Sequence, residues 1–432
     1  MSPISLAYIL VFLPIIFAII NYFFSNNLVS RYLFLFCNFT LAITSTIIIK
    51  NLSENINYSS GSSLLSLALE ISITREILFF IIMISLIQIF LRLIIKNIDN
   101  DAYKNDSLRL VMIFSINGIA FSSNLINILF FLEIYLLSQF KVFLNHGNKN
   151  FIKQIRQYFV NYCAASILLM ISFLIIFLNF NSFDLSILRE KVAIIHNYNL
   201  LKILSIIIIV LLAIIMVPVD LIKFLIKKFS LSNIYFLGII IFFNFNIGFL
   251  ILRKVDFLIF NNSTIYLLGL VALCLFLYSI YFVTFGRYMK MFFMASIFSS
   301  ISLIIFAFLI NIQNLNNFYL YWVNFNFINL ILLFYLFYLQ NNFKNTLLQN
   351  YFLISRSQVI AVFSILFFVA IIFLIFITNI SYISFALNQL KRDNKEVINY
   401  ISVFSIFAAL FNQIIYMKIF DNIFLQPKTM SR

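Results

Sequence analysis

A single glutamate stands in an otherwise apolar part of the sequence. The segment SSNLINILFFLEIYLLSQF covers residues 122–140, and Glu133 is its only charged residue. A carboxylate inside a hydrocarbon layer is costly, so acidic residues at such positions tend to face the interior of a helix bundle and to mark a proton or ion pathway. We therefore expect Glu133 to face the interior and to belong to such a pathway. The alternative is a carboxylate that a serine, an asparagine or a neighbouring subunit satisfies, with no role in transfer.

The elements that position Glu133 must be membrane-spanning helices. Of the 432 residues, 63% are hydrophobic and 10% are charged, whereas soluble domains carry about 25% charged residues. Runs of about 20 apolar residues, long enough to cross a hydrocarbon core about 30 Å thick, recur about 13 times. Backbone groups in lipid must be satisfied within each segment, and barrel strands would be shorter and alternate in polarity. The sequence thus predicts an all-α polytopic membrane protein.

We expect residues 1–432 to form a single membrane domain with short connections. The predicted spans cover residues 4–24, 31–49, 76–95, 108–121, 123–144, 157–179, 201–225, 231–252, 264–285, 288–310, 319–339, 358–388 and 399–423. Most of the charge lies in the loops, and the net charge of +15 is best explained by lysines beside membrane surfaces and anionic lipid. No basic run with interleaved aromatic residues points to nucleic acid.

The sequence lacks the residues of a self-contained enzyme. Cys37, Cys163 and Cys274 are far apart in apolar segments, which predicts core residues and no disulfide or metal framework. His146 and His196 fall in loops without a cysteine or carboxylate at ligand spacing, so we expect no metal site. A phosphate-binding glycine loop and a nucleophile elbow are also missing. Ion or proton transfer along buried polar groups needs few residues and remains open.

Five segments resemble the antiporter-like membrane-arm subunits of respiratory complex I, and NADH dehydrogenase subunit 2 in particular. Residues 106–140 are similar to a family helix ending in small polar residues, followed by an N-L-hydrophobic run that leads to a glutamate, here Glu133. The segment RQYFVNYCAASILLMISFLIIF (156–177) resembles the next helix of subunit 2, with Gln157 at a lysine position. Three later segments match in the same order: FGRYMKMFFMASIFSSISLIIFAF (285–308), FYLYWVNFNFINLILLFYL (318–336) and SIFAALFNQIIYMKIFDN (405–422).

The resemblance implies an antiporter-like fold. Three N-terminal helices would lie in residues 1–105, and two inverted five-helix repeats would follow in residues 106–252 and 264–423. Each repeat would contain one broken helix, the first at Pro218 and the second near Thr378 to Ser381. Broken helices at mid-membrane expose backbone polar groups to a cavity in ion-transfer folds.

The resemblance also implies partners and cofactors. Other membrane-arm subunits would lie on both flanks, together with phospholipid, of which cardiolipin is a candidate. NADH, flavin, iron-sulfur clusters and ubiquinone would belong to the assembled complex, and this chain would bind none of them. The richness in Phe, Ile and Asn is typical of AT-rich coding sequence, which favours the mitochondrial inner membrane.

This chain departs from the family at several positions of the implied proton path. The resemblance implies a glutamate on the fifth helix and lysines on the seventh, eighth and twelfth, but Ala213, Asn246 and Asn388 stand at the lysine positions. Asn244 lies beside Asn246, and amides do not titrate near neutral pH. Asp220 and Lys223, three residues apart, fall on one helical face and can pair locally.

The tenth predicted helix carries a second polar set. Lys290 opens it, and Ser296, Ser299, Ser300 and Ser302 follow. They form either a hydrated strip or the polar packing contacts common between membrane helices. Two functions therefore stay open: a subunit that contributes to proton translocation coupled to quinone reduction, or a mainly structural subunit that has lost its own path. A cation/proton antiporter subunit, or a scaffold subunit of another membrane complex, is the further alternative.

Overall fold

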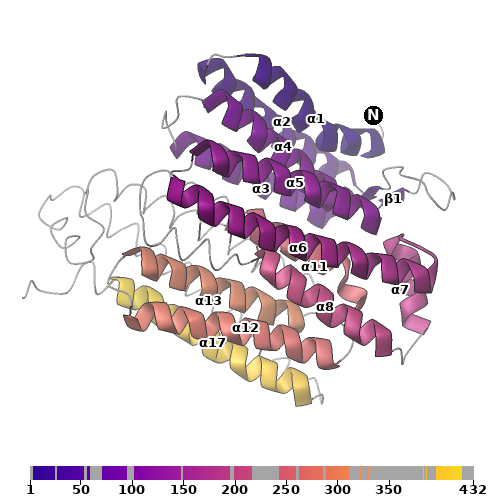
Figure 1. The fold of residues 1–432 in the computed structure, drawn as a ribbon, viewed down its shortest axis with the longest axis vertical. Coiled ribbons are helices and arrows are strands. Elements are labelled where there is room, and N and C mark those ends of the chain that lie inside the picture. The colour runs from indigo at the N-terminus through magenta and orange to yellow at the C-terminus, as the bar shows by residue number, and fades with distance from the viewer. Residues whose placement is uncertain are drawn as a thin grey trace, which may run out of the picture. The chain divides into compact units, whose positions relative to one another are not determined.

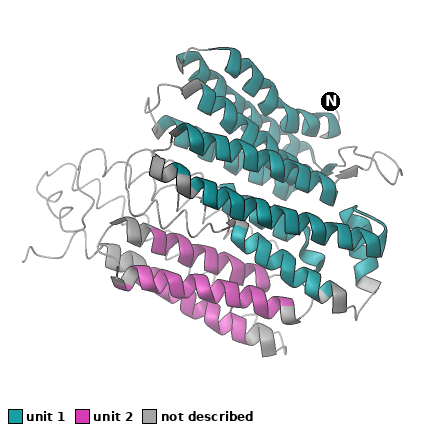
Figure 2. Ribbon diagram, in the orientation of Figure 1, with its two compact units in different colours: residues 1–227, 235–260 teal, residues 228–234, 261–432 magenta. Residues whose placement is uncertain are grey.

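The structure is a computed structural model of the chain. It comprises two compact units, residues 1–227 with 235–260, and residues 228–234 with 261–432 (Figure 2). The structure describes residues 3–24, 27–52, 56–58, 71–94, 102–146, 149–194, 199–216, 243–258, 262–285, 289–310, 322, 326, 329, 383, 386 and 396–420. We refer to the two parts as unit 1 and unit 2 and describe each by itself.

Unit 1 is a bundle of long helices (Figure 1). Its described helices are α1 (Pro3–Phe23), α2 (Asn27–Asn51), α3 (Arg75–Ile94), α4 (Ala102–Phe121), α5 (Leu125–His146), α6 (Lys149–Phe180), α7 (Leu185–Ile194), α8 (Asn199–Met216), α11 (Phe245–Lys254) and the short 3-10 helix η2 (Asp256–Leu258). Helix α4 packs against α1, α2 and α5, and α6 packs against α5 and α8. Helix α5 therefore contacts both α4 and α6.

The close approach of α4 and α5 depends on a glycine. A Cβ atom added at Gly118 would lie 2.3 Å from a ring carbon of Phe131. The Phe131 ring is buried and meets the Phe114 ring edge-on at a centroid distance of 5.3 Å. Only the missing side chain at residue 118 lets this aromatic pair fill the space between the two helices.

A short link turns the chain between α4 and α5. The Asn124 Oδ1 atom accepts a hydrogen bond of 2.9 Å from the Ile126 N–H, the usual way in which an asparagine caps a helix start. The segment after α6 pairs with this link, because the Leu125 N–H donates to the Phe183 carbonyl and the Leu185 N–H donates to the Ser123 carbonyl. The α4–α5 link is therefore fixed by main-chain hydrogen bonds from a distant part of unit 1.

Unit 2 contains three long described helices, α12 (Asn262–Phe285), α13 (Met289–Ile310) and α17 (Glu396–Phe420). Helix α13 packs against α12 and α17, and α12 also contacts α17. The boundary between the units near residue 260 lies between the two predicted repeats. The inverted relation of those repeats stays a prediction.

The expectation of a helical membrane fold is confirmed in its main feature. Six described helices are long and apolar enough to cross a membrane, and three shorter apolar helices accompany them. The expected total of about 13 spans is larger than the number of these described helices and stays a prediction. The all-α description needs one addition, because β1 (Ile56–Tyr58) and β2 (Ile71–Ile73) form an antiparallel pair.

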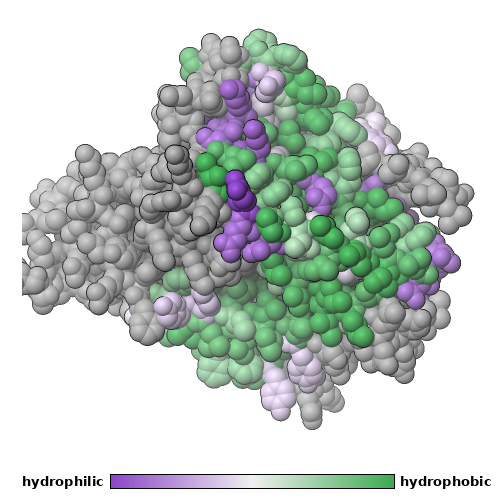
Figure 3. All heavy atoms as spheres, in the orientation of Figure 1, coloured by the Kyte–Doolittle hydropathy of each residue, from purple (hydrophilic) through white to green (hydrophobic). Residues whose placement is uncertain are grey.

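The face of the described helices drawn in Figure 3 is mostly apolar, with smaller hydrophilic patches. Large side chains point outward from many of them, including Ile16 on α1, Phe36 on α2 and Leu178 on α6. Buried polar residues are frequent by contrast, and they include Asn21, Asn38 and Asn117. The apolar outer surface suits contact with lipid or neighbouring subunits, and the buried polar residues satisfy one another inside the bundle or face its interior.

Candidate functional site

Four polar side chains form a hydrogen-bonded network inside unit 1. They belong to Tyr135 and Gln139 of α5, Tyr158 of α6, and Asn244 at the N-terminus of α11. We name these four residues the buried polar network. All four side chains are buried. Residues 243 and 244 lie in a π-helical turn directly before α11. Such turns are rare and occur often at functional sites.

The network is closed by hydrogen bonds on every side. Tyr135 Oη donates to Asn244 Oδ1 at 2.5 Å, and Gln139 Nε2 donates to the same oxygen at 2.8 Å. Asn244 Nδ2 donates to Tyr158 Oη at 2.8 Å, and Tyr158 Oη donates to Gln139 Oε1 at 3.2 Å. The Tyr135 and Tyr158 hydroxyls each accept one bond and donate another. A hydroxyl that does both can pass a proton along without keeping it.

Glu133 lies on the outer face of α5, and our expectation that it faces the interior of the bundle is wrong for this chain. The Glu133 side chain is exposed, together with those of Phe130 and Leu137 one turn before and after it. A helix advances by about 100° per residue. Because Tyr135 points inward, Glu133 must point outward. Its carboxylate acts electrostatically on Tyr162 and Cys163 of α6.

A buried lysine lies at the opposite end of α11 from the network. The Lys254 ammonium donates a hydrogen bond to the Ser122 carbonyl oxygen at the end of α4. Lys254 follows the predicted span 231–252. Burial is the main reason that its pKa is lowered from 10.5 to about 7, and the charges of Arg189 and Arg253 add to this effect. An amine with such a pKa can take up and release a proton near neutral pH.

Ion pairs surround this lysine at the same end of unit 1. Asp256 Oδ1 lies 2.9 Å from Arg189 Nη2, and Asp256 Oδ2 lies 2.5 Å from Arg253 Nη1. Arg253 also approaches Glu76 at 3.9 Å. These groups are partly exposed, so solvent screens them, and each pair contributes at most about 1 kcal/mol.

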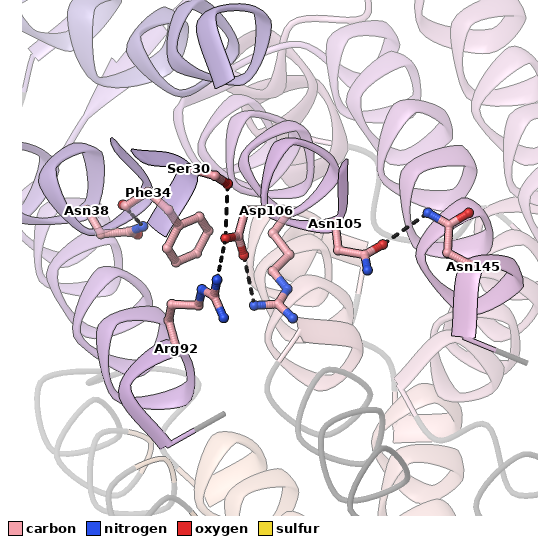
Figure 4. Close-up of polar contacts among 8 residues, drawn as sticks. Ser30, Phe34, Asn38, Arg92, Asn105, Asp106 and Asn145 are labelled. Carbon is pink, nitrogen blue, oxygen red and sulfur yellow. Dashed lines mark hydrogen bonds and ion pairs between the residues drawn. The ribbon is translucent and has the colours of Figure 1, made fainter. Parts of the chain in front are cut away.

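A second charged cluster lies at the other end of α4 (Figure 4). Asp106 Oδ2 lies 2.8 Å from Arg92 Nη2 of α3 and accepts a hydrogen bond of 3.3 Å from Ser30 Oγ of α2. Asp106 Oδ1 accepts a hydrogen bond of 3.2 Å from Arg109 Nη1. Next to it, Asn145 Nδ2 of α5 donates to Asn105 Oδ1 at 3.0 Å. The cluster ties together the ends of α2, α3 and α4.

The predicted polar set of the tenth span lies on α13 in unit 2. Ser296 and Ser299 are buried, and Ser299 Oγ donates to Asn412 Oδ1 of α17 at 2.6 Å. Ser300 Oγ bonds within its own helix to the Ser296 carbonyl at 2.7 Å. Lys290 lies in α13, but its side chain is outside the described part of the chain.

Asn246, the other eighth-helix candidate, is buried on α11, two residues after Asn244. Several predicted residues fall outside the described ranges, namely Pro218, Asp220, Lys223, Asn388 and the region from Thr378 to Ser381. The predicted helix breaks therefore stay predictions. Asn244 contacts other polar side chains, but these belong to Tyr135, Gln139 and Tyr158, which were not among the predicted site residues.

Tyr135, Gln139 and Tyr158 were not predicted as site residues from the sequence. Tyr135 and Gln139 are four residues apart and share a helical face, which is a signal that the sequence carries. Tyr158 and Lys254 carry no such local signal, because their partners are far away in the sequence.

Comparison with known proteins supports the fold. No protein-family model matches the chain, and no curated protein matches its sequence. A chain of the Mrp complex from Dietzia sp. DQ12-45-1b has a TM-score of 0.81 at 15% identity, and the match covers 99% of this chain and 82% of that one.

Two further solved structures are similar. A chain of the membrane-bound sulfane sulfur reductase, an archaeal respiratory membrane complex, has a TM-score of 0.74 at 12% identity over 100% of this chain and 90% of that one. A chain of respiratory complex I from Thermus thermophilus has a TM-score of 0.70 at 13% identity over 98% and 89%. The chain shares their fold. The predicted resemblance to a complex I-type membrane subunit is thus confirmed at the level of the fold.

Proposed function

We propose that the chain is an antiporter-like subunit in the membrane arm of a complex I-type respiratory complex and that it contributes to proton translocation. The observation that carries this proposal is the buried polar network of Tyr135, Gln139, Tyr158 and Asn244, which lies in the interior of a fold shared with chains of membrane complexes. Fully satisfied polar groups in the apolar interior of a membrane protein are typical of a transfer pathway.

The chemistry of the network fits transfer better than storage of protons. Tyrosine hydroxyls and amides stay neutral near pH 7, so they can relay a proton but cannot hold one. Storage would fall to titratable groups at the margins, with Glu133 on the outer face of α5 and Lys254 at the end of α11. The exposed position of Glu133 suggests that a neighbouring subunit completes its surroundings, because a carboxylate facing lipid is costly.

We also propose which subunits, lipids and membrane surround the chain. Other membrane-arm subunits would cover both flanks, phospholipid such as cardiolipin would fill the remaining surface, and the location would be the mitochondrial inner membrane. NADH oxidation with flavin and iron-sulfur clusters, and ubiquinone reduction, would take place in other subunits. Nucleic acid would not be a partner.

A mainly structural subunit is the second candidate. It is favoured by Ala213 and Asn246 at lysine positions of the family and by the neutrality of the buried polar network. A subunit of a cation/proton antiporter complex is the third candidate, and the TM-score of 0.81 to a chain of the Mrp complex favours it.

The test uses the intact complex that contains this chain, purified in mild detergent and reconstituted into vesicles. Proton translocation per NADH oxidised is compared for the unchanged complex, Gln139→Leu and Leu137→Ala. Gln139→Leu removes three hydrogen bonds of the network. Leu137→Ala changes an exposed position on the same helix and serves as the control.

We expect the assembly to oxidise NADH. Proton translocation per NADH oxidised should be reduced in Gln139→Leu and unchanged in Leu137→Ala. Full translocation by a stable Gln139→Leu complex would favour the structural role. Purification of the chain in an assembly that exchanges cations for protons without oxidising NADH would favour the third candidate.

A further inference from the structure

The hydroxyl of Tyr162 is buried without a hydrogen-bond partner among the described residues. The side chain is 1% exposed. Burial of a hydroxyl without a hydrogen-bond partner is unfavourable. Proteins commonly satisfy such groups with a bound water that contacts two to four polar partners.

Tyr162 lies near polar groups of both α5 and α6. Tyr162 follows Tyr158 by one turn of α6, and their rings meet edge-on at a centroid distance of 5.7 Å. Tyr162 also lies close enough to Tyr135 for an electrostatic interaction. The charge of Glu133 also acts on Tyr162. Tyr162 is thus near both the outward-facing acid and the two tyrosines of the buried polar network.

We propose that the Tyr162 hydroxyl binds a water molecule and that this pair connects Glu133 to the buried polar network. The inference rests on the proposed role in proton translocation and names the entry to the path. In each transfer, the water and each hydroxyl release one proton as they accept another. The proton leaves the Glu133 carboxyl, which becomes a carboxylate, for the water. The water passes one to the Tyr162 hydroxyl, that hydroxyl passes its own to the network, and the network releases one of its protons to a basic amine or carboxylate beyond it. No charge remains on the phenol.

Tyr162 is also well placed for this role because of the helix geometry. Glu133 and Tyr135 are two residues apart on α5 and point to opposite sides, so the acid cannot reach the network through its own helix. Helix α6 packs against α5 and offers a polar group at the same level. A neutral relay at this position joins the two faces without another buried charge.

The experiment compares four variants in the intact complex reconstituted into vesicles: Tyr162→Phe, Glu133→Gln, the double variant, and Tyr32→Phe. Tyr32→Phe removes the same atom from a tyrosine on α2 that is 69% exposed. Proton translocation per NADH oxidised, NADH oxidation and thermal stability are measured for each. Infrared difference spectra in normal and heavy water report the bound water.

We expect Tyr162→Phe to lower proton translocation by the same fraction as Glu133→Gln. The double variant should lose no more, because residues acting in one path are not additive. Thermal stability of Tyr162→Phe should equal or exceed that of the unchanged complex, since the hydroxyl has no partner in the described chain. A water O–H stretching band should disappear in Tyr162→Phe and persist in Tyr32→Phe.

The outcomes separate this inference from the proposed function. Normal translocation by Tyr162→Phe beside a loss in Glu133→Gln would overturn the relay and leave the proposed function standing. Losses that add in the double variant would also overturn it, because the two residues would then act independently. Normal translocation by both single variants would remove the support for a path through Glu133 and overturn the relay with it.

Discussion

The side-chain nitrogen of Lys254 donates a hydrogen bond to the Ser122 carbonyl oxygen, at the point where α4 ends. The contact joins the last residue of α11 to the α4–α5 link. It also places an amine in a buried position between partly exposed ion pairs formed by Arg189, Arg253 and Asp256.

The lowered pKa of Lys254 predicts a pH dependence of stability. The folded protein releases this proton near pH 7, whereas the unfolded chain releases it near 10.5. Between these values the unfolded chain binds more protons, so stability should rise with pH by up to about 1.4 kcal/mol per unit. Below about pH 7 both states are protonated, and the contribution is constant. Melting temperatures of the solubilised complex across this range, with and without Lys254→Met, measure the effect.

Lys141→Met is the control for this measurement, because Lys141 is exposed on α5. It should keep the slope that Lys254→Met removes. An identical slope in the unchanged protein and in Lys254→Met would contradict a lowered pKa at Lys254.

Gly118→Ala should destabilise unit 1. The added Cβ would lie 2.3 Å from the buried Phe131 ring, and overpacking of this kind costs about 1–3 kcal/mol. Gly269→Ala is a matched control in α12, because its Cβ would meet nothing closer than 3.9 Å. Thermal unfolding of the purified complex should show the loss for the first substitution alone. Equal melting temperatures for the two variants would mean that α4 and α5 are not in close contact.

Asp106→Asn should be far more damaging than the same change at Asp256. The first substitution leaves the buried guanidinium groups of Arg92 and Arg109 without the carboxylate between them, and breaking such a buried pair costs about 3–5 kcal/mol. The ion pairs of Asp256 are partly exposed and contribute about 1 kcal/mol or less. The amount of assembled complex recovered from membranes compares the two variants. Similar recovery would argue against the Asp106 cluster as a tie between helices.

Ser299→Ala should weaken the contact between α13 and α17. It removes the donor of the 2.6 Å bond to Asn412 Oδ1, with a cost of about 1 kcal/mol. Ser300→Ala, which removes a bond within α13 itself, should have a smaller effect on thermal unfolding. A loss of proton translocation in Ser299→Ala at unchanged stability would instead support a hydrated strip along α13.

The sequence was sufficient to predict most helices but not their rotation. Apolar runs predicted residues 4–24 and 264–285, and the structure has α1 at Pro3–Phe23 and α12 at Asn262–Phe285. These limits follow from hydropathy and from the need to satisfy backbone groups in lipid. Large apolar residues lie on both the outer and the inner face of α5, so its hydrophobic pattern did not show which way Glu133 points.

The rest of the site depends on contacts between distant residues. Tyr158 meets Asn244 across 86 positions, and Lys254 meets Ser122 across 132. Such pairs are decided by helix packing, which local residue types do not specify. The antiparallel pair of β1 and β2 was missed for a related reason, since its strands have three residues each and give too short a pattern to be recognised.

The burial of α4 bears on how the chain is made. This helix carries Asp106 and Arg109, is buried along most of its length, and packs against α1, α2 and α5. Isolated in lipid, its charged N-terminal part would be expensive to insert. With α1 to α3 already in the bilayer, Ser30 and Arg92 are present to receive the carboxylate. We therefore expect α4 to insert stably into the membrane only after α1 to α3 have inserted and packed together, because these helices provide the partners for its charged residues.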